Sequence, residues 1–381
     1  MKPMDPALQE KYLSFLKEMG VEEDQATAAD MLQTVVRLAK DQPGRAEMKL
    51  MARSFKELRY AFKVFKPYRS RRKVSIFGSA RTPPTNPNYQ CAAQFAKLLA
   101  EAGFMVITGA GGGIMAAGHE GAGLAHSFGV AIRLPFEQKT NDFIANDEKL
   151  IHFRYFFSRK LVFVKETHAI ALFPGGFGTH DEGFEVLTLV QTGRCDPLPI
   201  VLMEAPGGTY WKAWDNFVRQ ELLGQELISP EDTSLYFITQ NPVEAVRHIA
   251  RFYRNYQSLR YMQEHLVLRL KQAPTAPELA TLQTDFKDIV VDGKMELVAA
   301  QEIEPGTEIL PDASRLRFAF DRRLLARLRM LIDRLNDLPS LPPEGTATPA
   351  SQTGTPTESD RGLGQIADEE AIKLTGTGTV A

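Results

Sequence analysis

The sequence predicts an α/β fold: a Rossmann-like, doubly wound parallel sheet with an N-terminal helical extension and a small C-terminal α+β extension. Between about residues 73 and 260, short apolar runs alternate with amphipathic stretches, and glycine clusters follow several of the runs. Buried strands that alternate with helices are typical of βαβ units, which build parallel sheets. The length of 381 residues leaves room for further segments on either side of such a domain.

Residues 1–68 are predicted to form the helical extension, because they contain no strand-like run and their apolar residues recur at helical spacing. The recurring residues include Tyr12, Phe15, Leu16, Met31, Val35 and Leu38. The basic segment 69–73 leads into the first apolar run. It is either a nucleic-acid patch or the solvated entrance of a strand, and the second interpretation is favoured because most charge runs face water.

The α/β domain is predicted to span residues 69–260. Its candidate strands are 74–78, 104–108, 128–134, 169–173, 200–203 and 236–238, and examples of the helices between them are 91–102 and 181–192. The candidate strands are short and apolar almost throughout, as expected for strands that are covered on both faces.

Residues 261–338 are predicted to form the C-terminal extension. Two β runs within 285–299 flank Asp292-Gly293, a favourable type I′ turn, and so predict a hairpin. A helix over 322–335 follows, and its arginines are expected to form the wet side of an amphipathic helix rather than a grip for an anionic effector. Residues 339–381 are rich in Gly, Pro, Ser and Thr and contain no aromatic residue, which predicts a disordered tail.

The composition indicates an ordinary soluble protein that acts on neither membranes nor nucleic acids. Lys plus Arg number 45 and Asp plus Glu 47, so the net charge of −2 gives no general attraction to DNA or anionic lipid. No apolar run reaches the roughly 20 residues of a membrane span, and the N-terminus has no signal-peptide pattern. Cys91 and Cys195 have neither disulfide-framework nor zinc-ligand spacing. We therefore expect a cytoplasmic protein without a metal site.

The strongest chemical motif is the segment 174–182 (PGGFGTHDE), which follows the candidate strand 169–173 and opens a helix. Gly175, Gly176 and Gly178 let the main chain approach a ligand closely, and Thr179 can cap the helix and donate a hydroxyl. A helix N-terminus adds partial positive charge, so the segment suits a phosphate. The alternative is a tight βα turn that binds nothing.

Two further glycine turns follow predicted strands. The segment 108–115 (TGAGGGIM) contains Gly111, Gly112, Gly113 and Met115, but it matches neither the GxGxxG dinucleotide fingerprint nor a Walker A loop. The segment 77–81 contributes Gly78 and Ser79. In a parallel sheet all three turns lie on the carboxyl edge, where ligands bind, so the sequence predicts a nucleotide-shaped crevice.

A cation and a carboxylate are expected to share this crevice. Arg159 and Lys160 stand near the start of the helix that leads into strand 169–173, and Glu182 stands in the first turn of the next helix. Both helices begin at the carboxyl edge of the sheet. A surface Arg-Lys pair without function is the alternative.

Three of these motifs resemble the LOG ("Lonely Guy") family, whose members are often mislabelled as lysine decarboxylases and are known in plants for cytokinin activation. They are GGGIM at 111–115, SRK at 158–160 and PGGFGTHDE at 174–182, and the interval between Arg159 and Glu182 also matches the family. Residues 134–138 with Asn141, and the Phe pair before Arg159, look more like the longer bacterial members. The resemblance covers about residues 73–260.

The resemblance implies a phosphoribohydrolase that cleaves a nucleoside 5′-monophosphate, of purine or cytokinin type, to free base and ribose 5-phosphate. Glu182 and Arg159 would be catalytic, the 175–179 loop would hold the 5′-phosphate, and Asp181 and Lys160 would contact the substrate. No cofactor is implied, and nothing around Lys160 suggests the pyridoxal phosphate pocket of a true lysine decarboxylase. The alternative is a nucleotide sensor or a carrier of a phosphorylated cofactor, without turnover.

The sequence departs from the family at two positions and adds segments outside it. His180 stands where the family commonly has Leu or Met, and Gly183 where it has Leu. The family also implies a homodimer or higher homo-oligomer. An apolar surface that includes Tyr253, Tyr256 and Leu259 is expected to need such a partner.

Overall fold

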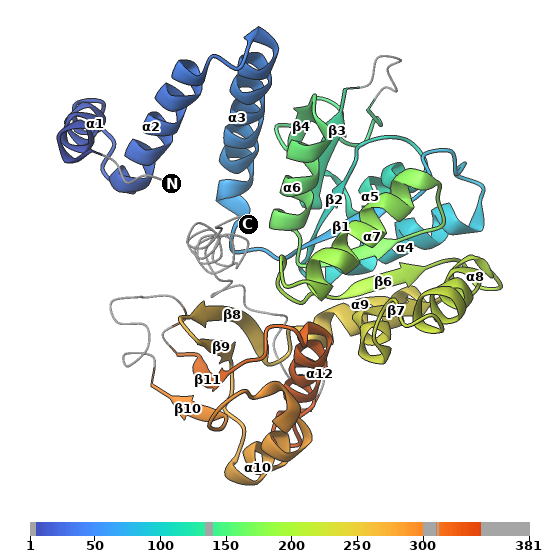
Figure 1. Ribbon diagram of the computed structural model, residues 1–381. Helices are drawn as coiled ribbons and strands as arrows, with labels where there is room; N and C mark the ends of the chain where they lie inside the picture. The colour runs from blue at the N-terminus through green and yellow to red at the C-terminus, as the bar shows by residue number, and fades with distance from the viewer. Residues whose placement is uncertain (1–4, 134–139, 300–309, 311, 344–381) are drawn as a thin grey trace. The chain divides into compact units, whose positions relative to one another are not determined.

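The computed structural model describes residues 5–133, 140–299, 310 and 312–343 (Figure 1). The chain divides into two units, Met1–Arg59 and Tyr60–Ala381. The helices are α1 Pro6–Glu18, α2 Gln25–Asp41, α3 Arg45–Phe65, α4 Pro87–Glu101, α5 Ile114–Ala122, α6 Phe156–Glu166, α7 Phe177–Gln191, α8 Tyr210–Phe217, α9 Pro242–Phe252, α10 Ala276–Asp285 and α12 Leu325–Asn336. Short 3-10 segments are Lys66–Tyr68, Leu124–His126, Pro230–Leu235 and Lys287–Ile289, and Val218–Leu223 is a π-helix.

The first unit is helical, as the sequence predicts. Asp5 caps α1 by accepting a hydrogen bond from the Ala7 backbone N–H at 2.9 Å. Few of the described side chains in this unit are buried; Leu16 and Ala29 are the apolar ones. Large apolar side chains therefore reach the surface of the three helices, including Phe15, Met19, Met31, Val35, Met51 and Phe55.

A seven-stranded parallel sheet forms the centre of the second unit and confirms the predicted fold class. Its strands are β1 Lys73–Phe77, β2 Met105–Thr108, β3 Ser127–Ile132, β4 Leu150–Phe153, β5 Ala169–Leu172, β6 Ile200–Met203 and β7 Tyr236–Thr239. They lie in the order β4-β3-β2-β1-β5-β6-β7, with every pair parallel. The chain runs outward from β1 to β4 and then returns to β5 on the other side of β1. The order in which strands are added to the sheet therefore reverses between β1 and β5. Such a reversal point is where α/β proteins bind ligands.

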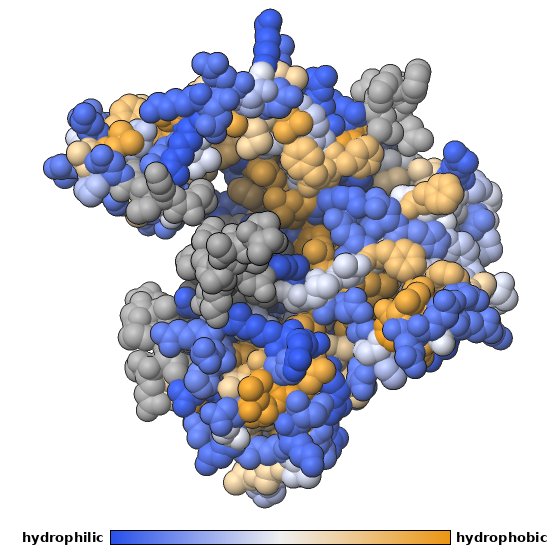
Figure 2. Space-filling view, viewed as in Figure 1, coloured by the Kyte–Doolittle hydropathy of each residue, from blue (hydrophilic) through white to orange (hydrophobic). Residues whose placement is uncertain are grey.

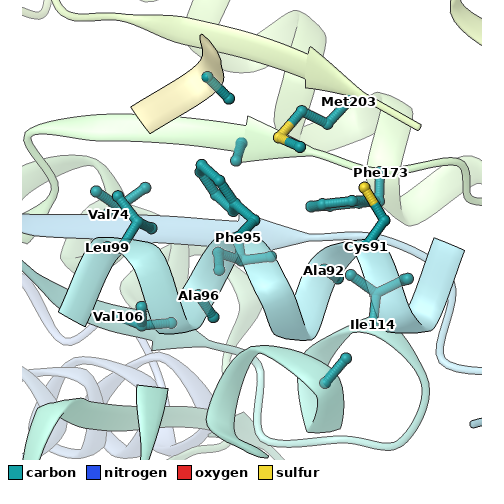
Figure 3. Close-up of a cluster of buried hydrophobic side chains, with 14 of the residues drawn as sticks. Val74, Cys91, Ala92, Phe95, Ala96, Leu99, Val106, Ile114, Phe173 and Met203 are labelled. Atoms are coloured by element: carbon teal, nitrogen blue, oxygen red, sulfur yellow. The ribbon is translucent and has the colours of Figure 1, made fainter. Parts of the chain in front are cut away.

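Helices cover both faces of this sheet. Val74 and Ile76 of β1 point into an apolar cluster with residues of α4, α5 and α9, part of which is drawn in Figure 3. Phe77 points to the opposite face, where its ring lies 4.8 Å from that of Phe163 on α6. Leu172 of β5 faces Gly183 of α7 on that same side. The alternation of side chains along each strand thus explains why the sheet is apolar on both faces.

A second, antiparallel sheet carries the C-terminal extension. Its strands are β8 Tyr256–Met262, β9 His265–Leu270, β10 Glu296–Val298 and β11 Ser314–Ala319, in the order β10-β11-β9-β8. The hairpin predicted around Asp292-Gly293 is wrong: a 3-10 helix precedes that turn, and β10 pairs with β11. Instead the hairpin joins β8 to β9, where Gln263 takes a positive φ of 56°.

The apolar surface that was expected to need a partner is covered within the chain. Tyr253, Tyr256 and Leu259 belong to the apolar cluster between the second sheet and α10 and α12. Tyr256 and Leu259 lie on β8 rather than on a helix. The expectation of an exposed helical surface at these residues is wrong, because a helical spacing of apolar residues at the end of α9 continues by chance into a strand.

Helix α12 joins the two sheets. The sequence predicts that its arginines face water, but one of them, Arg329, is buried. Arg329 is only 2% exposed and donates a hydrogen bond to the Leu198 carbonyl at 3.0 Å. Its guanidinium also lies 4.6 Å from the centre of the Phe252 ring. Past α12, Leu341 is buried and Ser340 hydrogen-bonds to Glu278, so residues 339–343 pack on the extension. The rest of the predicted tail, and the family-like segment 134–139, lie outside the described residues.

Candidate active site

Three glycine turns meet at the point where the strand order reverses, between β1 and β5. They follow β1, β2 and β5, which are neighbours in the sheet. The turn after β1 is bonded to both others: the Ser79 N–H donates to the Pro174 carbonyl at 3.2 Å, and the Ser79 carbonyl accepts from the Ile114 N–H at 3.1 Å. The candidate residues Gly78, Ser79, Gly111, Gly112, Gly113, Gly175, Gly176 and Gly178 therefore belong to one connected edge, as the parallel sheet predicts.

Glycine is required where the turns touch. A Cβ atom on Gly113, which has a φ of +60°, would lie 2.1 Å from the Ser79 carbonyl oxygen. A Cβ on Gly175 would lie 2.1 Å from the Thr179 Oγ1 and 3.0 Å from the Ser79 nitrogen. By contrast, a Cβ on Gly176 or Gly178 would meet no atom within 4 Å. The turn after β5 is thus packed on one side and open on the other.

Helix α7 begins three residues earlier than the capping role of Thr179 requires. Gly176 is the N-cap, and the N–H of Thr179 donates to the Gly176 carbonyl at 3.0 Å. Thr179 is therefore inside the first turn and does not cap the helix. Glu182 follows in the second turn rather than in the predicted first turn. Its side chain is buried, as is that of Thr179.

Glu182 has an unusual ionisation for a glutamate. Burial raises its pKa from 4.5 to about 7, although the neighbouring cations Arg159 and Lys160 pull in the opposite direction. Glu185 and Asp181, on the same helix, add a smaller upward contribution. A carboxyl group that titrates near neutral pH at a ligand-binding edge is a strong candidate for acid-base or charge-stabilising chemistry.

Arg159 reaches the same edge from α6. Its Nε–H donates to the Val130 carbonyl at 2.9 Å, and its guanidinium lies 5.0 Å from the centre of the Phe163 ring. Gly109 leaves room for the guanidinium, since a Cβ there would lie 2.7 Å from Arg159 Nη2 and from Met115 Sδ. Burial lowers the pKa of Arg159, and the charge of Glu182 opposes this shift.

Lys160 links α6 to the acidic face of α7. Its Nζ lies 2.9 Å from Asp181 Oδ2 and 2.8 Å from Glu185 Oε2. Burial lowers the pKa of Lys160, but the hydrogen bonds to Glu185 and Asp181 outweigh it, so that the net shift is upward. The side chain of Asp181 is 59% exposed. Lys160 and Asp181, which were expected to contact substrate, therefore also contact each other.

A buried polar network supports the turn after β2. His119 is 1% exposed and lies 3.0 Å from both Thr108 Oγ1 and the Phe128 carbonyl oxygen. Asn141 lies 3.2 Å from the other ring nitrogen of His119 and donates to the Gly111 carbonyl at 2.9 Å. Thr108 Oγ1 accepts from the N–H of Ala110, a residue with a φ of +60°. These bonds give His119 a structural role under the turn after β2.

Tyr210 also reaches this edge, although no sequence motif marks it. Its hydroxyl lies 2.7 Å from His180 Nε2 and 2.5 Å from the Gly175 carbonyl oxygen, so it touches the turn after β5 directly. Its ring also stacks on that of His180, with the centres 5.8 Å apart. Tyr210 stands at the start of α8, a glycine-preceded helix after β6, and this position at the carboxyl edge was the available signal.

Within residues 5–133, 140–299, 310 and 312–343, no helix is long and apolar enough to cross a membrane. Over the same residues, no group of three or more His, Cys, Asp or Glu side chains is placed to hold a metal ion.

Comparison with known proteins identifies the α/β region. Residues 110–249 match the family model described as "Possible lysine decarboxylase". No curated protein matches the chain. Among solved structures, TM1055, a structural genomics target, is 19% identical, with a TM-score of 0.35 over 47% of this chain and 99% of that one.

Two other solved structures have names that mention a cofactor. The molybdenum cofactor binding protein of Rippkaea orientalis is 20% identical, with a TM-score of 0.33 over 47% of this chain and 96% of its own. The molybdenum cofactor carrier protein of Chlamydomonas reinhardtii is 16% identical, with a TM-score of 0.32 over 48% and 97%. The residues that match the family model include both Arg159 and Glu182. This match supports a LOG-like family for the α/β region.

Proposed function

We propose that the chain is a phosphoribohydrolase that hydrolyses the N-glycosidic bond of a nucleoside 5′-monophosphate of purine or cytokinin type. The observation that carries the proposal is the buried Glu182 carboxyl, with a pKa near 7, beside Arg159 at the edge formed by three glycine turns. A module that only binds a phosphate needs the turns, but it has no use for a buried carboxylate whose ionisation costs free energy.

The proposed reaction uses the charge of Glu182 at the anomeric carbon. The bond between C1′ and the base nitrogen breaks with its electron pair leaving on the base, and positive charge builds up on the ribosyl ring. The Glu182 carboxylate stabilises this charge and accepts a proton from the water whose oxygen bonds to C1′. The base takes up a proton from solvent, Glu182 releases its proton to solvent, and ribose 5-phosphate is the second product.

Arg159 and the turn after β5 hold the substrate in this scheme. The first N–H groups of α7 lack partners within the helix and point toward an anion that binds at its N-terminus. Gly176 and Gly178 leave the space beside that turn open. The guanidinium of Arg159, fixed by the Val130 carbonyl, supplies positive charge beside Glu182.

The environment of Lys160 does not support a lysine decarboxylase. Lys160 is the residue at this site that would have to bind pyridoxal phosphate. A Schiff base with pyridoxal phosphate needs a neutral lysine amine. The Lys160 amine instead forms ion pairs with Asp181 and Glu185, which raise its pKa and keep it protonated. The Lys160 environment therefore does not fit that cofactor.

A panel of nucleoside 5′-monophosphates, assayed for released base by chromatography, tests the proposal. We expect turnover of at least one of them and much poorer turnover of the matching nucleoside, since the phosphate positions the ribose. Glu182→Gln should lower turnover by roughly two to four orders of magnitude. Asp181→Asn, at the exposed carboxylate one residue away, tests the assignment: loss of turnover in this variant but not in Glu182→Gln would contradict the catalytic role of Glu182. Binding of monophosphates without release of base would support a sensor or carrier instead.

The homo-oligomer also stays a proposal, now based on a different surface. Phe156, Phe157 and Leu161 of α6 and Phe184 of α7 are exposed apolar side chains, and apolar patches over these helices are visible in Figure 2. A second copy of the chain would cover them. Light scattering that gives the 42.5 kDa mass of one chain at micromolar concentration would contradict this proposal.

A further inference from the structure

The hydroxyl group of Tyr210 connects three elements beside the candidate phosphate turn. It lies 2.5 Å from the Gly175 carbonyl oxygen in the turn after β5 and 2.7 Å from His180 Nε2 on α7. Tyr210 itself begins α8, which follows β6. Nothing in the proposed chemistry assigns a task to Tyr210 or His180.

The protons in this arrangement can be assigned from the donors and acceptors. A carbonyl oxygen only accepts, so the single hydroxyl proton of Tyr210 must go to Gly175. The Tyr210 oxygen then accepts from His180, whose Nε2 must carry a hydrogen. Burial lowers the pKa of His180, which favours the neutral imidazole. The hydrogen bond to the Tyr210 oxygen then places the one ring hydrogen on Nε2.

Tyr210 is held rigidly enough to fix what it touches. The buried carboxylate of Glu204 accepts hydrogen bonds from the Tyr210 N–H at 3.0 Å and the Trp211 N–H at 3.3 Å. The indole N–H of Trp211 donates to the Met203 carbonyl at 2.8 Å. The ring of Tyr210 packs against those of His180 and Trp211, with centres 5.8 and 4.9 Å away, and the His180 and Trp211 rings also contact each other at 6.1 Å. The first turn of α8 is thus anchored to the end of β6.

Holding the Gly175 carbonyl sets the direction of the next N–H group. In a trans peptide the C=O of Gly175 and the N–H of Gly176 point in opposite directions. Because the carbonyl is held by Tyr210, the Gly176 N–H must point away from α8. Glycine at 175 and 176 would otherwise let this peptide plane rotate at little cost.

We propose that Tyr210, with His180 as its hydrogen-bond donor, is a positioning residue that orients the Gly175–Gly176 peptide for binding the 5′-phosphate. The inference rests on the proposed function, because it assigns a phosphate to the turn after β5. Tyr210 acts through the peptide plane and touches neither the ribose nor the base. Its loss should therefore weaken phosphate binding and leave the chemical step intact.

Tyr210→Phe is the decisive variant, because it removes the hydroxyl and keeps the ring that packs against His180 and Trp211. We expect the KM for the nucleoside monophosphate to rise roughly tenfold, with kcat within about twofold of the parent value. Turnover of the nucleoside without phosphate should not change. Calorimetry with ribose 5-phosphate should show the same roughly tenfold weakening.

Tyr236→Phe is the matched control. The Tyr236 hydroxyl also donates a short hydrogen bond, to Asp215 Oδ1 at 2.6 Å, and its ring packs on Trp214 in the same aromatic cluster. It does not reach the turn after β5. This variant should lose a comparable amount of thermal stability while the KM stays unchanged.

Three results would overturn the inference. The first is a KM that changes no more in Tyr210→Phe than in Tyr236→Phe. The second is a loss of kcat that is equal for nucleotide and nucleoside, which indicates general damage to the site. The third is that the unmodified chain binds no ribose 5-phosphate. If the chain binds ribose 5-phosphate but cleaves no nucleotide, the hydrolase proposal fails, and the calorimetric comparison still decides the role of Tyr210.

Discussion

Glu182 is buried between opposing charges, and the balance of these charges sets its ionisation. Burial alone pushes its pKa upward, Arg159 and Lys160 pull it down, and the result is a pKa near 7. Lys160 has a second effect, because it holds Asp181 and Glu185 in ion pairs on the same helix. The proton affinity of the candidate catalytic group therefore depends on burial first, and then on two cations of α6, Arg159 and Lys160, that oppose it.

The pH dependence of turnover should reveal the contribution of Lys160. In the proposed mechanism the carboxylate is the active form, so kcat should rise with pH below about 7 and level off above it. Lys160→Met removes a cation that lowers the Glu182 pKa and leaves two unpaired carboxylates, so the midpoint should move to higher pH. Lys160→Arg keeps the charge and serves as the control. A Lys160→Met profile with an unchanged midpoint would contradict the electrostatic coupling.

Element by element, the sequence predicts well where strands are buried on both faces. Such strands are continuous apolar runs, so six of the seven strands of the parallel sheet are found near their predicted positions. Only β4 is missed, since His152 interrupts its short apolar run at the edge of the sheet. Once parallel strands are assigned, the glycine turns, Arg159 and Glu182 must share one edge, which is why their proximity is predictable from sequence.

The antiparallel extension could not be predicted in the same way. Asp292-Gly293 is a strong local turn signal, but pairing in a sheet is decided by distant partners, and β10 finds β11 instead. The true hairpin turns at Gln263 without glycine. Buried arginines also interrupt the apolar pattern of two strands of the extension, Arg269 in β9 and Arg315 in β11. For the same reason, the Tyr210 hydroxyl bond and the Glu182 pKa depend on packing that no local pattern reports.

Asn336, the last residue of α12, is expected to be the most sensitive polar residue of the extension. Its Oδ1 accepts from the backbone N–H groups of Asn255 and Tyr256 at 2.8 Å each, and its Nδ2 donates to the Phe252 carbonyl. Asn336→Ala leaves three buried backbone groups unpaired and should cost about 2–4 kcal/mol in the free energy of unfolding. Chemical denaturation of the parent chain and the variant measures this loss in the free energy of unfolding.

The neighbouring residue provides the control for that variant. Asp337 pairs with Arg251 on a partly exposed surface, so Asp337→Asn should cost less than about 1 kcal/mol. Equal losses in the two variants would show that the end of α12 responds to any change, and that the buried bonds of Asn336 have no special weight.

At the scale of the whole second unit, α12 ties the antiparallel sheet to the domain that carries the candidate site. Arg329 is the centre of this connection. It donates to the Leu198 carbonyl just before β6, lies over the Phe252 ring of α9, and forms an ion pair with Asp333 at 3.1 Å. Leu325 reaches Gly193 at the end of α7, the helix of Glu182. The extension is thus packed against the far end of the candidate catalytic helix.

Arg329→Met should weaken the coupling between the two sheets, so that the antiparallel sheet can unfold without the parallel one. Much of the apolar packing should be preserved. The variant leaves the buried Leu198 carbonyl without its partner, and such a loss typically costs about 1–3 kcal/mol. Because the lost contacts cross between the sheets, hydrogen exchange should quicken first in β8–β11 while β1–β7 keep their protection. Arg327→Met is the control, since Arg327 binds Asp288 and Asp285 within the extension itself. Uniform loss of protection across both sheets in Arg329→Met would mean that they unfold as one cooperative unit, and that α12 is part of a single core rather than a connection between two.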